Sequence, residues 1–544
     1  MLLQWGTVPR PLYIVRGGRD ASPPYLSVSC LVSAMTEANT SPPHVRSEDD
    51  VVIVATGGVS PTGRDPEEAH RAAVEFRTGL RLLTPLDIEH FDVMACMKGL
   101  STPEEKLAFF RNAWGDKCGV GGVIPAEYLP DPESGFYPTT FFKRGERLVG
   151  RSILQAYVAL EQIRGKLQAL FADEGRRIRA DLAPETIMDI GCGMGCAMER
   201  VEREFAEFLH AENTPQLGMN YGKTKWLLGV LENMVAAQMA AQAGVQGGQS
   251  SSNAACASSG FSMLNGFNAL QSRSADVAIV GGSEYATGAV VTLAFDAMMK
   301  KRGALTRNWR NDRRAEHALL AFGAGRDGFV PGDAAGLVVM MRRRVADLLG
   351  VEPLAWVRSV VANTCQSQMY DKNLADGTIT GQAALLTRLF GKIGVEVADI
   401  RGRLVHFLHG TGTKVGAINE LYAVAKALGD LALDGRYSGT GVKEREGHSL
   451  GAAMVANVIA LIEAMRNRCV PGLPTTREVD PALRTADPQV IGREGITVDP
   501  RALNAVADGI LCRRHQAFDP ERDVGVVTAM GFGGSNVAVL LKSE

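Results

Sequence analysis

The sequence has no long apolar run, no cysteine framework and almost no net charge. No run approaches the 18 apolar residues that a membrane-spanning helix needs, so we predict no membrane span. Nine cysteines lie scattered along 544 residues, which is unlike a secreted disulfide scaffold and fits a reducing cytoplasm. The formal net charge of -2 argues against bulk nucleic-acid binding. What remains is an ordinary globular composition, with 46% hydrophobic and 22% charged residues.

Strand and helix patterns alternate along the chain. Residues 1–49 are rich in proline, without periodicity or a signal-peptide core, and we interpret them as an N-terminal extension. A buried strand at 51–55, a glycine-rich loop at 56–63 and a helix to about residue 79 then open the fold. The pattern restarts near residue 320. We therefore predict an α/β protein with halves at 50–318 and 319–544.

The remaining periodic segments fit this alternation. Strands are predicted at 186–190, 276–284, 337–341, 404–408 and 537–541, and helices at 152–170, 196–210, 223–243, 380–390, 417–428 and 449–466. Residues 85–150 are mixed and turn-rich, and we expect a cap or an insertion there.

One cysteine lies where a strand-like stretch meets a helix. Ser250 to Gly260 is small and polar around Cys256, and a helical pattern follows from Phe261. Small neighbours leave room for a substrate, and a helix N-terminus favours the thiolate. A packed core cysteine explains the stretch about as well.

Two histidines and a lysine lie in glycine-rich turns downstream. His409 follows a predicted strand, His448 precedes a predicted helix, and Lys443 comes five residues before His448. Strand ends of an α/β sheet are where ligands meet backbone amides. The loop at 530–536 contains glycines that would let backbone N–H groups form an oxyanion hole for a cysteine nucleophile.

Five motifs, taken in order, resemble the β-ketoacyl synthases. They are NAACASSG at 253–260, RDGFVPGD at 326–333, HGTGT at 409–413, GHSLGAA at 447–453 and GFGGSN at 531–536. The resemblance covers about residues 50–544. It implies a thiolase-like fold, in which two related α/β halves pack as a five-layer sandwich, and a homodimer. It also implies decarboxylative Claisen condensation of an acyl thioester with malonyl-(acyl-carrier-protein), without a cofactor or a metal.

The resemblance also assigns roles to individual residues. Cys256 would carry the acyl chain, His409 and His448 would hold the malonyl thioester carbonyl, and Lys443 would support the histidines. The amides of Cys256 and Phe532 would form the oxyanion hole, with Phe532 as a gate. The remaining substrate contacts are expected at Thr411, Thr413, Gly533 and Gly534.

The sequence departs from the family at two of these motifs and in longer segments. Ala417 stands where the family usually has aspartate, and Met454 ends the run GAAM where the family has glycine. Residues 1–49, parts of 80–150 and 478–524 are unlike the compact bacterial enzymes. These departures bear on the choice of substrate more than on the type of reaction.

Other interpretations remain open from sequence alone. The run after Asp189 imitates the loop of S-adenosylmethionine methyltransferases, and Gly447 to Gly451 fits the Gly-x-Ser-x-Gly elbow around Ser449. A further alternative within the same fold is a relative that initiates synthesis or only decarboxylates malonyl units. A non-catalytic scaffold that binds carrier protein is an alternative from another class.

A basic stretch suggests a partner. Lys300, Lys301, Arg307 and Arg310 lie close together in the sequence, and they favour docking of an acidic acyl carrier protein. A solvated charged face is the simpler explanation of the same stretch.

Overall fold

The computed structural model describes most of the chain from residue 47 onward. The described residues are 47–87, 100–110, 119–143, 146–147, 149–172, 176–194, 198–199, 231–298, 304–312, 314–365, 374–394, 397, 400–485 and 497–543. All of them belong to one compact unit. Three predicted segments lie largely outside this described part: the N-terminal extension, the helix at 196–210 apart from residues 198–199, and the start of the helix at 223–243.

One large sheet organises the described residues. Its strands are β1 (Val51–Val59), β8 (Thr186–Gly191), β9 (Gln249–Ser250), β10 (Val277–Glu284), β11 (Ala334–Arg342), β12 (Ala355–Thr364), β13 (Leu404–Phe407), β14 (Tyr437–Thr440), β17 (Val524–Gly531) and β18 (Ser535–Lys542). The larger helices are α1 (Pro66–Val74), α4 (Arg151–Lys166), α8 (Met234–Ala243), α9 (Ser258–Gln271), α10 (Ala289–Ala297), α13 (Leu374–Gly391), α14 (Lys414–Leu433), α16 (Ala453–Arg466) and α18 (Pro500–Gly509).

The strands form two sets with the same topology. Across the sheet, the first set runs β9-β8-β10-β11-β1 and the second runs β14-β13-β17-β18-β12. Numbered by chain order within each set, both read 3-2-4-5-1. The pairings agree as well: the first three strands of each set are parallel, and the other pairings are antiparallel. This repeat confirms the predicted duplication of α/β halves.

The two sets meet through a short antiparallel pairing between β1 and β12. Only Val52 with Trp356 and Ile53 with Ala355 are paired there. Strand β11 lies beyond the boundary predicted at 318/319, yet it pairs with β1 and β10 of the first set. We therefore propose that the halves divide at helix α12 (Arg343–Leu349), between β11 and β12.

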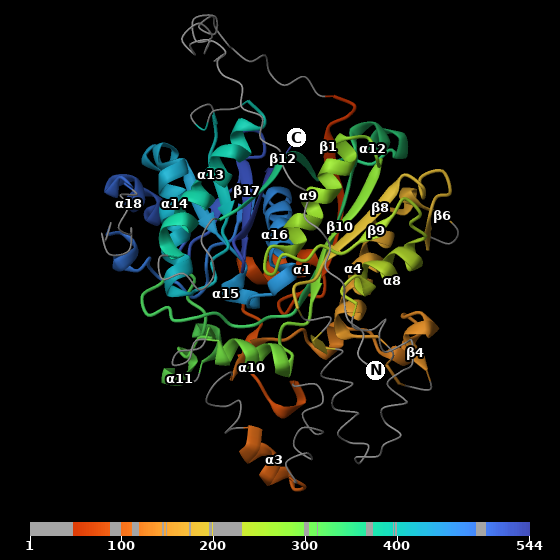
Figure 1. The fold of residues 1–544 in the computed structure, drawn as a ribbon, viewed down its shortest axis with the longest axis horizontal. Helices are drawn as coiled ribbons and strands as arrows, with labels where there is room; N and C mark the ends of the chain where they lie inside the picture. The colour runs from red at the N-terminus through yellow and green to blue at the C-terminus, as the bar shows by residue number, and fades with distance from the viewer. Residues whose placement is uncertain are drawn as a thin grey trace, which may run out of the picture. The chain divides into compact units, whose positions relative to one another are not determined.

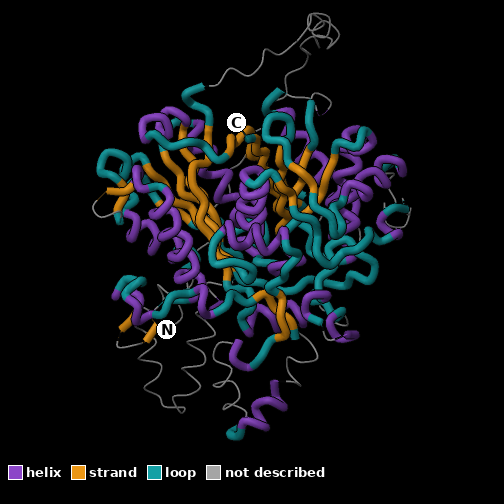
Figure 2. The backbone as a smooth tube through the Cα atoms, turned by 180° about the vertical axis from the view of Figure 1, so that it is seen from behind, coloured by secondary structure: helices purple, strands orange, loops and turns teal. Residues whose placement is uncertain are grey.

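Helices and strands alternate in five layers. Figure 1 shows α9 and α16 between the two groups of strands, and Figure 2 shows the same central layer from behind. Helices α4 and α8 contact the first set, α13 and α14 contact the second, and α9 and α16 contact strands of both. Three apolar cores fill the spaces between these layers. The central layer matters most for the site, because Cys256 and His448 lie just before its two helices.

Local sequence explains the strands that were predicted and corrects one boundary. Strands β1 and β11 are buried along their whole length, so their sequences read as apolar runs rather than as alternating patterns. The loop predicted from residue 56 begins later, because β1 continues to Val59. Gly57 stays in the strand to let α4 approach: a Cβ there would lie 2.1 Å from the carbonyl oxygen of Ala159.

The segment predicted as a cap carries only short elements in its described part. These are β2 (Leu80–Leu82), α3 (Pro103–Phe110), β3 (Val120–Gly122), β4 (Phe142–Lys143) and β5 (Glu146–Arg147). No helix in the described part of the chain is both long enough and apolar enough to cross a bilayer.

Candidate active site

Cys256 lies in a strained turn just before α9. Ala255 has a φ of 50°, in the left-handed region that residues with a side chain seldom adopt. Ser258 fixes this turn, because its hydroxyl donates to the carbonyl of Ala255 at 2.6 Å and accepts from the amide of Ala254 at 2.9 Å. The predicted turn is therefore present, and the cysteine side chain is 5% exposed.

The charge state of Cys256 differs from the prediction. We expected the helix N-terminus to favour a thiolate, but burial raises the pKa of the thiol to about 12. Lys443 lowers this pKa and Glu284 raises it, both with smaller effects than burial. The prediction of a favoured thiolate is wrong for the resting protein, because burial raises the pKa by more than Lys443 lowers it. The thiol must lose its proton as it reacts.

His409 is held by the strand end of β13 and by two neighbouring elements. The carboxylate of Glu420, on α14, accepts the amide of His409 at 2.5 Å and that of Gly410 at 2.8 Å. The amide of Met530 donates to Nδ1 of His409 at 3.5 Å. Because Nδ1 accepts, the proton of the neutral ring resides on Nε2, which is then free to donate.

His448 faces His409. The two rings are perpendicular, with centroids 5.3 Å apart, and the ring of Phe329 packs edge-on against His448 at 5.3 Å. A short backbone pairing with Pro331 anchors His448, whose amide donates to the carbonyl of Val330 at 2.6 Å. Burial, and then the charge of Lys443, hold the pKa of both imidazoles well below the ordinary value. Both rings are therefore neutral near pH 7.

Lys443 lies at the centre of this group. Its ammonium is buried, and Nζ has no hydrogen-bond partner among the described residues. The same charge lowers the pKa of Cys256, His409 and His448, so all three surround it. Burial lowers the pKa of Lys443 itself, and the negative charge of Glu420 raises it. The lysine thus interacts with a cysteine that lies 187 positions before it in the sequence (443 − 256).

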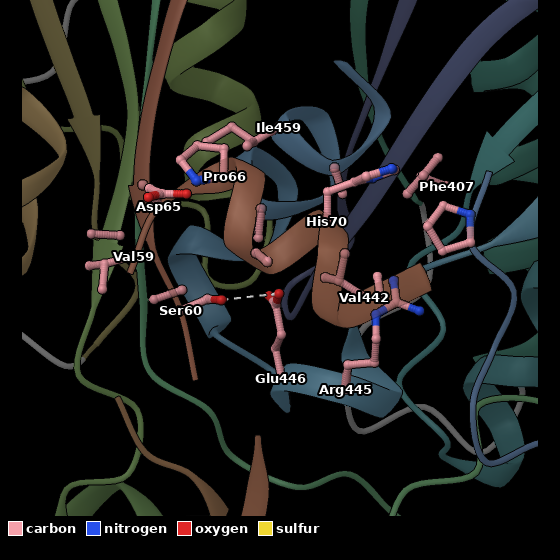
Figure 3. Close-up of a pocket in the computed structure, with 18 residues that line it drawn as sticks. Val59, Ser60, Asp65, Pro66, His70, Phe407, Val442, Arg445, Glu446 and Ile459 are labelled. Atoms are coloured by element: carbon pink, nitrogen blue, oxygen red, sulfur yellow. Dashed lines mark hydrogen bonds between the residues drawn. The ribbon is translucent and has the colours of Figure 1, made fainter. Parts of the chain in front are cut away.

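Every side chain of α15 (Lys443–Glu446) is charged and buried. Glu444 accepts three backbone amides from two neighbouring loops, at 2.7 to 2.9 Å, and Arg445 donates to two backbone carbonyls at 3.1 Å. Glu446 accepts from two hydroxyls of the loop after β1, one of them Ser60 at 3.1 Å (Figure 3). Three charged neighbours, each engaged by a different part of the fold, therefore hold the lysine in place.

A small cavity of about 50 Å³ lies beside α15. Ser60, His70, Arg445 and Glu446 are among its lining residues (Figure 3). Burial and the nearby Arg445 lower the pKa of His70 to about 4. Cys256 does not line this cavity, so it is separate from the reacting thiol.

The glycine-rich loop between β17 and β18 closes the site. Gly531 packs against the turn before the cysteine: a Cβ there would lie 2.2 Å from the carbonyl oxygen of Ala254. Gly533 and Gly534 have φ values of 87° and 85°, which glycine alone adopts easily. The side chain of Phe532 is 45% exposed, and its ring centroid lies 6.1 Å from that of Phe295 on α10.

The other predicted site residues have mixed surroundings. The hydroxyl of Thr413 caps α14 by accepting the amide of Gly416 at 3.2 Å, and it lies 3.1 Å from the hydroxyl of Thr411. Arg310 is exposed, and Arg307 lies 3.9 Å from Asp296. Lys300 and Lys301 lie outside the described residues.

The two competing motifs have structural explanations. The amides of Gly193 and Met194 bind the buried carboxylate of Glu284, so the loop that imitates a methyltransferase motif is already occupied. Ser449 is buried and follows helix α15 rather than a strand, which is unlike a nucleophile elbow. In the part of the chain that the structure describes, no cluster of three or more His, Cys, Asp or Glu residues could hold a metal ion.

The two departures from the family pattern are buried in apolar cores. Ala417 is 1% exposed on α14, in the outer core of the second half. Met454 packs on α9 in the central layer: a Cβ on Gly260 would lie 2.4 Å from its sulfur. Met454 therefore contributes to helix packing.

Sequence reasoning missed two carboxylates. Glu284 was only the end of a predicted strand, and Glu420 was given no role. Each is buried and accepts backbone amides beside the catalytic candidates. No local pattern marks such residues, because their partners lie on other elements of the fold. Glu284 binds amides 91 and 167 residues away, and Glu420 binds amides 11 and 10 residues before it.

The class is defined by a duplicated 3-2-4-5-1 sheet with a shared central helix layer, and by a cysteine and two histidines that interact with one buried lysine: it is a thiolase-like α/β enzyme. Residues 140–346 match the family described as "Beta-ketoacyl synthase, N-terminal domain", and residues 358–476 match "Beta-ketoacyl synthase, C-terminal domain". The chain therefore belongs to the β-ketoacyl synthase family and is a condensing enzyme of the acyltransferase type. The family predicted from the five motifs is confirmed.

Individual relatives agree with this assignment. The 3-oxoacyl-(acyl-carrier-protein) synthase 2 of Vibrio harveyi is 22% identical over 498 residues, covering 91% of this chain and 99% of the relative. Nodulation protein E of Rhizobium meliloti is 25% identical over 367 residues, covering 67% of this chain and 80% of the relative.

Solved structures show the same fold. A type II PKS ketosynthase in complex with its acyl-carrier protein has a TM-score of 0.66 at 17% identity, covering 91% of this chain and 99% of that one. The ishigamide ketosynthase/chain length factor has a TM-score of 0.65 at 19% identity, with coverage of 91% and 99%.

Proposed function

We propose that this condensing enzyme joins an acyl group held on Cys256 to a malonyl unit carried by an acyl carrier protein. The observation that carries the proposal is a pair of neutral imidazoles whose ring centroids lie 5.3 Å apart. The charge of the buried Lys443 acts on both of them and on the thiol of Cys256. Neutral imidazoles donate N–H to a developing oxyanion, and a nearby cation keeps them neutral.

In the first step, the sulfur of Cys256 attacks the acyl thioester of the carrier. The acyl–sulfur bond to the carrier breaks, a new thioester forms on Cys256, and the carrier leaves as a thiol with the proton of Cys256. The charge of Lys443 offsets part of the burial cost as negative charge develops on the sulfur.

In the second step, the malonyl thioester places its carbonyl between His409 and His448. Loss of carbon dioxide leaves an enolate, whose oxygen accepts N–H from the two rings. The enolate carbon attacks the acyl carbonyl on Cys256, and the amides of Cys256 and Phe532 hold the resulting oxyanion. That attack forms the carbon–carbon bond. Collapse of the intermediate re-forms the carbonyl and breaks the carbon–sulfur bond, and the released sulfur of Cys256 regains a proton from solvent.

A mass-detected adduct tests the first step. Incubation with an acyl carrier thioester should add one acyl group to Cys256, and Cys256→Ala should abolish the adduct. If Ser449→Ala abolished loading while Cys256→Ala did not, the serine elbow would be the correct interpretation. A chain that loads nothing but still binds carrier protein would be a scaffold.

A product assay separates an extending enzyme from its relatives. With acyl and malonyl carrier thioesters together, an extending synthase releases a 3-oxoacyl product two carbons longer. A decarboxylating relative releases acetyl carrier and carbon dioxide only. The same assay, run over a series of acyl lengths, gives the chain-length preference.

The partners are part of the proposal. The type II PKS neighbour was solved with its acyl-carrier protein, and this chain carries the basic stretch around Arg307 and Arg310. Reversing both charges should slow carrier loading at low salt, and unchanged kinetics would exclude this docking site. A homodimer in the cytoplasm is also proposed, and sedimentation equilibrium measures the oligomeric state directly.

A further inference from the structure

A second buried carboxylate holds the catalytic turns. Glu284 ends β10 with a fully buried side chain. Its carboxylate accepts the amide of Gly193 at 2.6 Å, that of Met194 at 3.0 Å and that of Gly451 at 3.0 Å. A carboxylate accepts several such bonds, while a neutral amide of the same shape has only one acceptor oxygen.

The arrangement repeats what Glu420 does in the other half. Strands β8 and β13 occupy the same place in the two sets. Gly193 and Met194 lie two and three residues beyond β8, and both amides bind Glu284. Two and three residues beyond β13, the amides of His409 and Gly410 bind Glu420. In each half, a buried carboxylate thus binds the loop that follows the second strand of the set. The two carboxylates come from different elements, Glu284 from β10 and Glu420 from α14.

Glu284 also joins the two turns that carry the reacting groups. Gly451 comes three residues after His448, and its amide binds the carboxylate directly. A Cβ on Gly193 would lie 3.2 Å from the carbonyl oxygen of Ala255, so the pinned loop touches the residue before Cys256. One side chain therefore fixes the spacing between the segment of the sulfur and the segment of an imidazole.

We propose that Glu284 is a positioning residue of the catalytic centre, the counterpart of Glu420 in the first half. It holds the turns of Cys256 and His448 together, and its negative charge beside the thiol opposes the positive charge of Lys443. This inference rests on the proposed roles of Cys256 and His448.

The charges that face Cys256 set the direction of the expected effects. Lys443, from α15, lowers the pKa of the thiol, whereas burial and Glu284, from β10, raise it. His409 and His448 are uncharged near pH 7. Removing the charge of Glu284 should therefore lower the pKa of Cys256, and shortening the side chain should leave the charge while breaking the contacts.

Two variants of Glu284 distinguish the effect of its charge from the effect of its side-chain length. Glu284→Gln removes the charge, and the iodoacetamide alkylation rate of Cys256, measured by peptide mass mapping from pH 7 to 9, should rise at every pH. The gain is about tenfold for each unit by which the pKa falls. Glu284→Asp keeps the charge but withdraws the carboxylate by one methylene. Its alkylation profile should match the wild type, while its condensation rate falls about tenfold or more.

Asp189→Asn is the matched control. Asp189 is 1% exposed on β8 and accepts from Ser250 and Ser252, close to the cysteine turn, but it does not contribute to the pKa of Cys256. Its alkylation profile should match the wild type. A shift as large as that of Glu284→Gln would assign the effect to general loosening and overturn the proposal.

The remaining outcomes are also decisive. The proposal is overturned if Glu284→Gln alkylates at the wild-type rate or more slowly, or if Glu284→Asp condenses at the wild-type rate. If Glu284→Gln does not fold, Glu284→Asp alone decides through its condensation rate. Alkylation needs no condensation, so it tests Glu284 even if the wild type forms no acyl adduct and the proposed function fails.

Discussion

Glu420→Gln should weaken the hydrogen bonds that hold the loop of His409 in place. The carboxylate is 3% exposed, accepts the amides of His409 and Gly410, and raises the pKa of Lys443. Glutamine has one acceptor oxygen, so one of the two amides loses its partner. A buried N–H without a partner costs about 1–3 kcal/mol. If the histidine loop moves to recover that bond, malonyl decarboxylation should slow by about 10- to 100-fold, since each 1.4 kcal/mol corresponds to about tenfold in rate.

The same variant has a second, electrostatic consequence. Without Glu420, burial lowers the pKa of Lys443 further, and the lysine becomes neutral at lower pH. Cys256 then loses the cation that lowers its own pKa, so alkylation at a fixed pH should slow. This direction is opposite to that expected for Glu284→Gln.

Release of carbon dioxide from a malonyl thioester and alkylation by iodoacetamide measure the two effects. Glu463→Gln is a suitable control, because Glu463 is also fully buried but pairs with Arg466 on α16. The reasoning is refuted if Glu420→Gln retains wild-type decarboxylation and alkylation, or if Glu463→Gln reproduces its losses.

Three further predictions concern packing, strain and pH. Gly260→Ala should lower the free energy of unfolding by about 1–3 kcal/mol in a urea titration, because its Cβ would lie 2.4 Å from the sulfur of Met454. In a Met454→Ala background, Gly260→Ala should cost less free energy of unfolding than it does in the wild type. Equal costs in the two backgrounds would contradict the contact. Ala255→Gly should stabilise the fold by up to about 1 kcal/mol by relieving the φ of 50°, yet slow acyl transfer because the turn of Cys256 loosens; an equal or faster transfer rate would exclude a role for the strain. Burial lowers the pKa of His406 to about 3, so its contribution to stability is present above pH 6.5 and is lost as the pH falls from 6.5 through about 3. Over this window, His406→Gln should reduce the pH slope of the unfolding free energy by about 1.4 kcal/mol per pH unit, and an unchanged slope would show that the ring is not buried neutral.

The sequence predicted the parts of the site that depend on short segments. The turn at Cys256, the strand end at His409 and the glycine-rich turn at His448 are each encoded within about ten residues, so local pattern and family motif both found them. Most strands and helices were also predicted, because they carry long apolar periodicity. Strands β12 and β17, the two neighbours of β18 in the second set, were missed, and so was β14.

What the sequence could not predict depends on depth in the folded protein. The thiolate expected at a helix N-terminus is disfavoured because Cys256 is buried, and burial is a property of the whole fold. The roles of Glu284 and Glu420 depend on amides from segments 91 residues away and 11 residues away, respectively. A strand end and one helical glutamate carry no local sign of such partners.

Because the strand orders match, Cys256 and His448 lie at corresponding positions of the two halves. In the first copy of the repeat, the segment from β9 to the central helix α9 carries Cys256; in the second, the segment from β14 to the central helix α16 carries His448. The same bend of the repeat therefore presents a sulfur in one half and an imidazole in the other. Because Glu284 and Lys443 each act on both segments, a substitution in one copy is expected to change the surroundings of the functional group in the other.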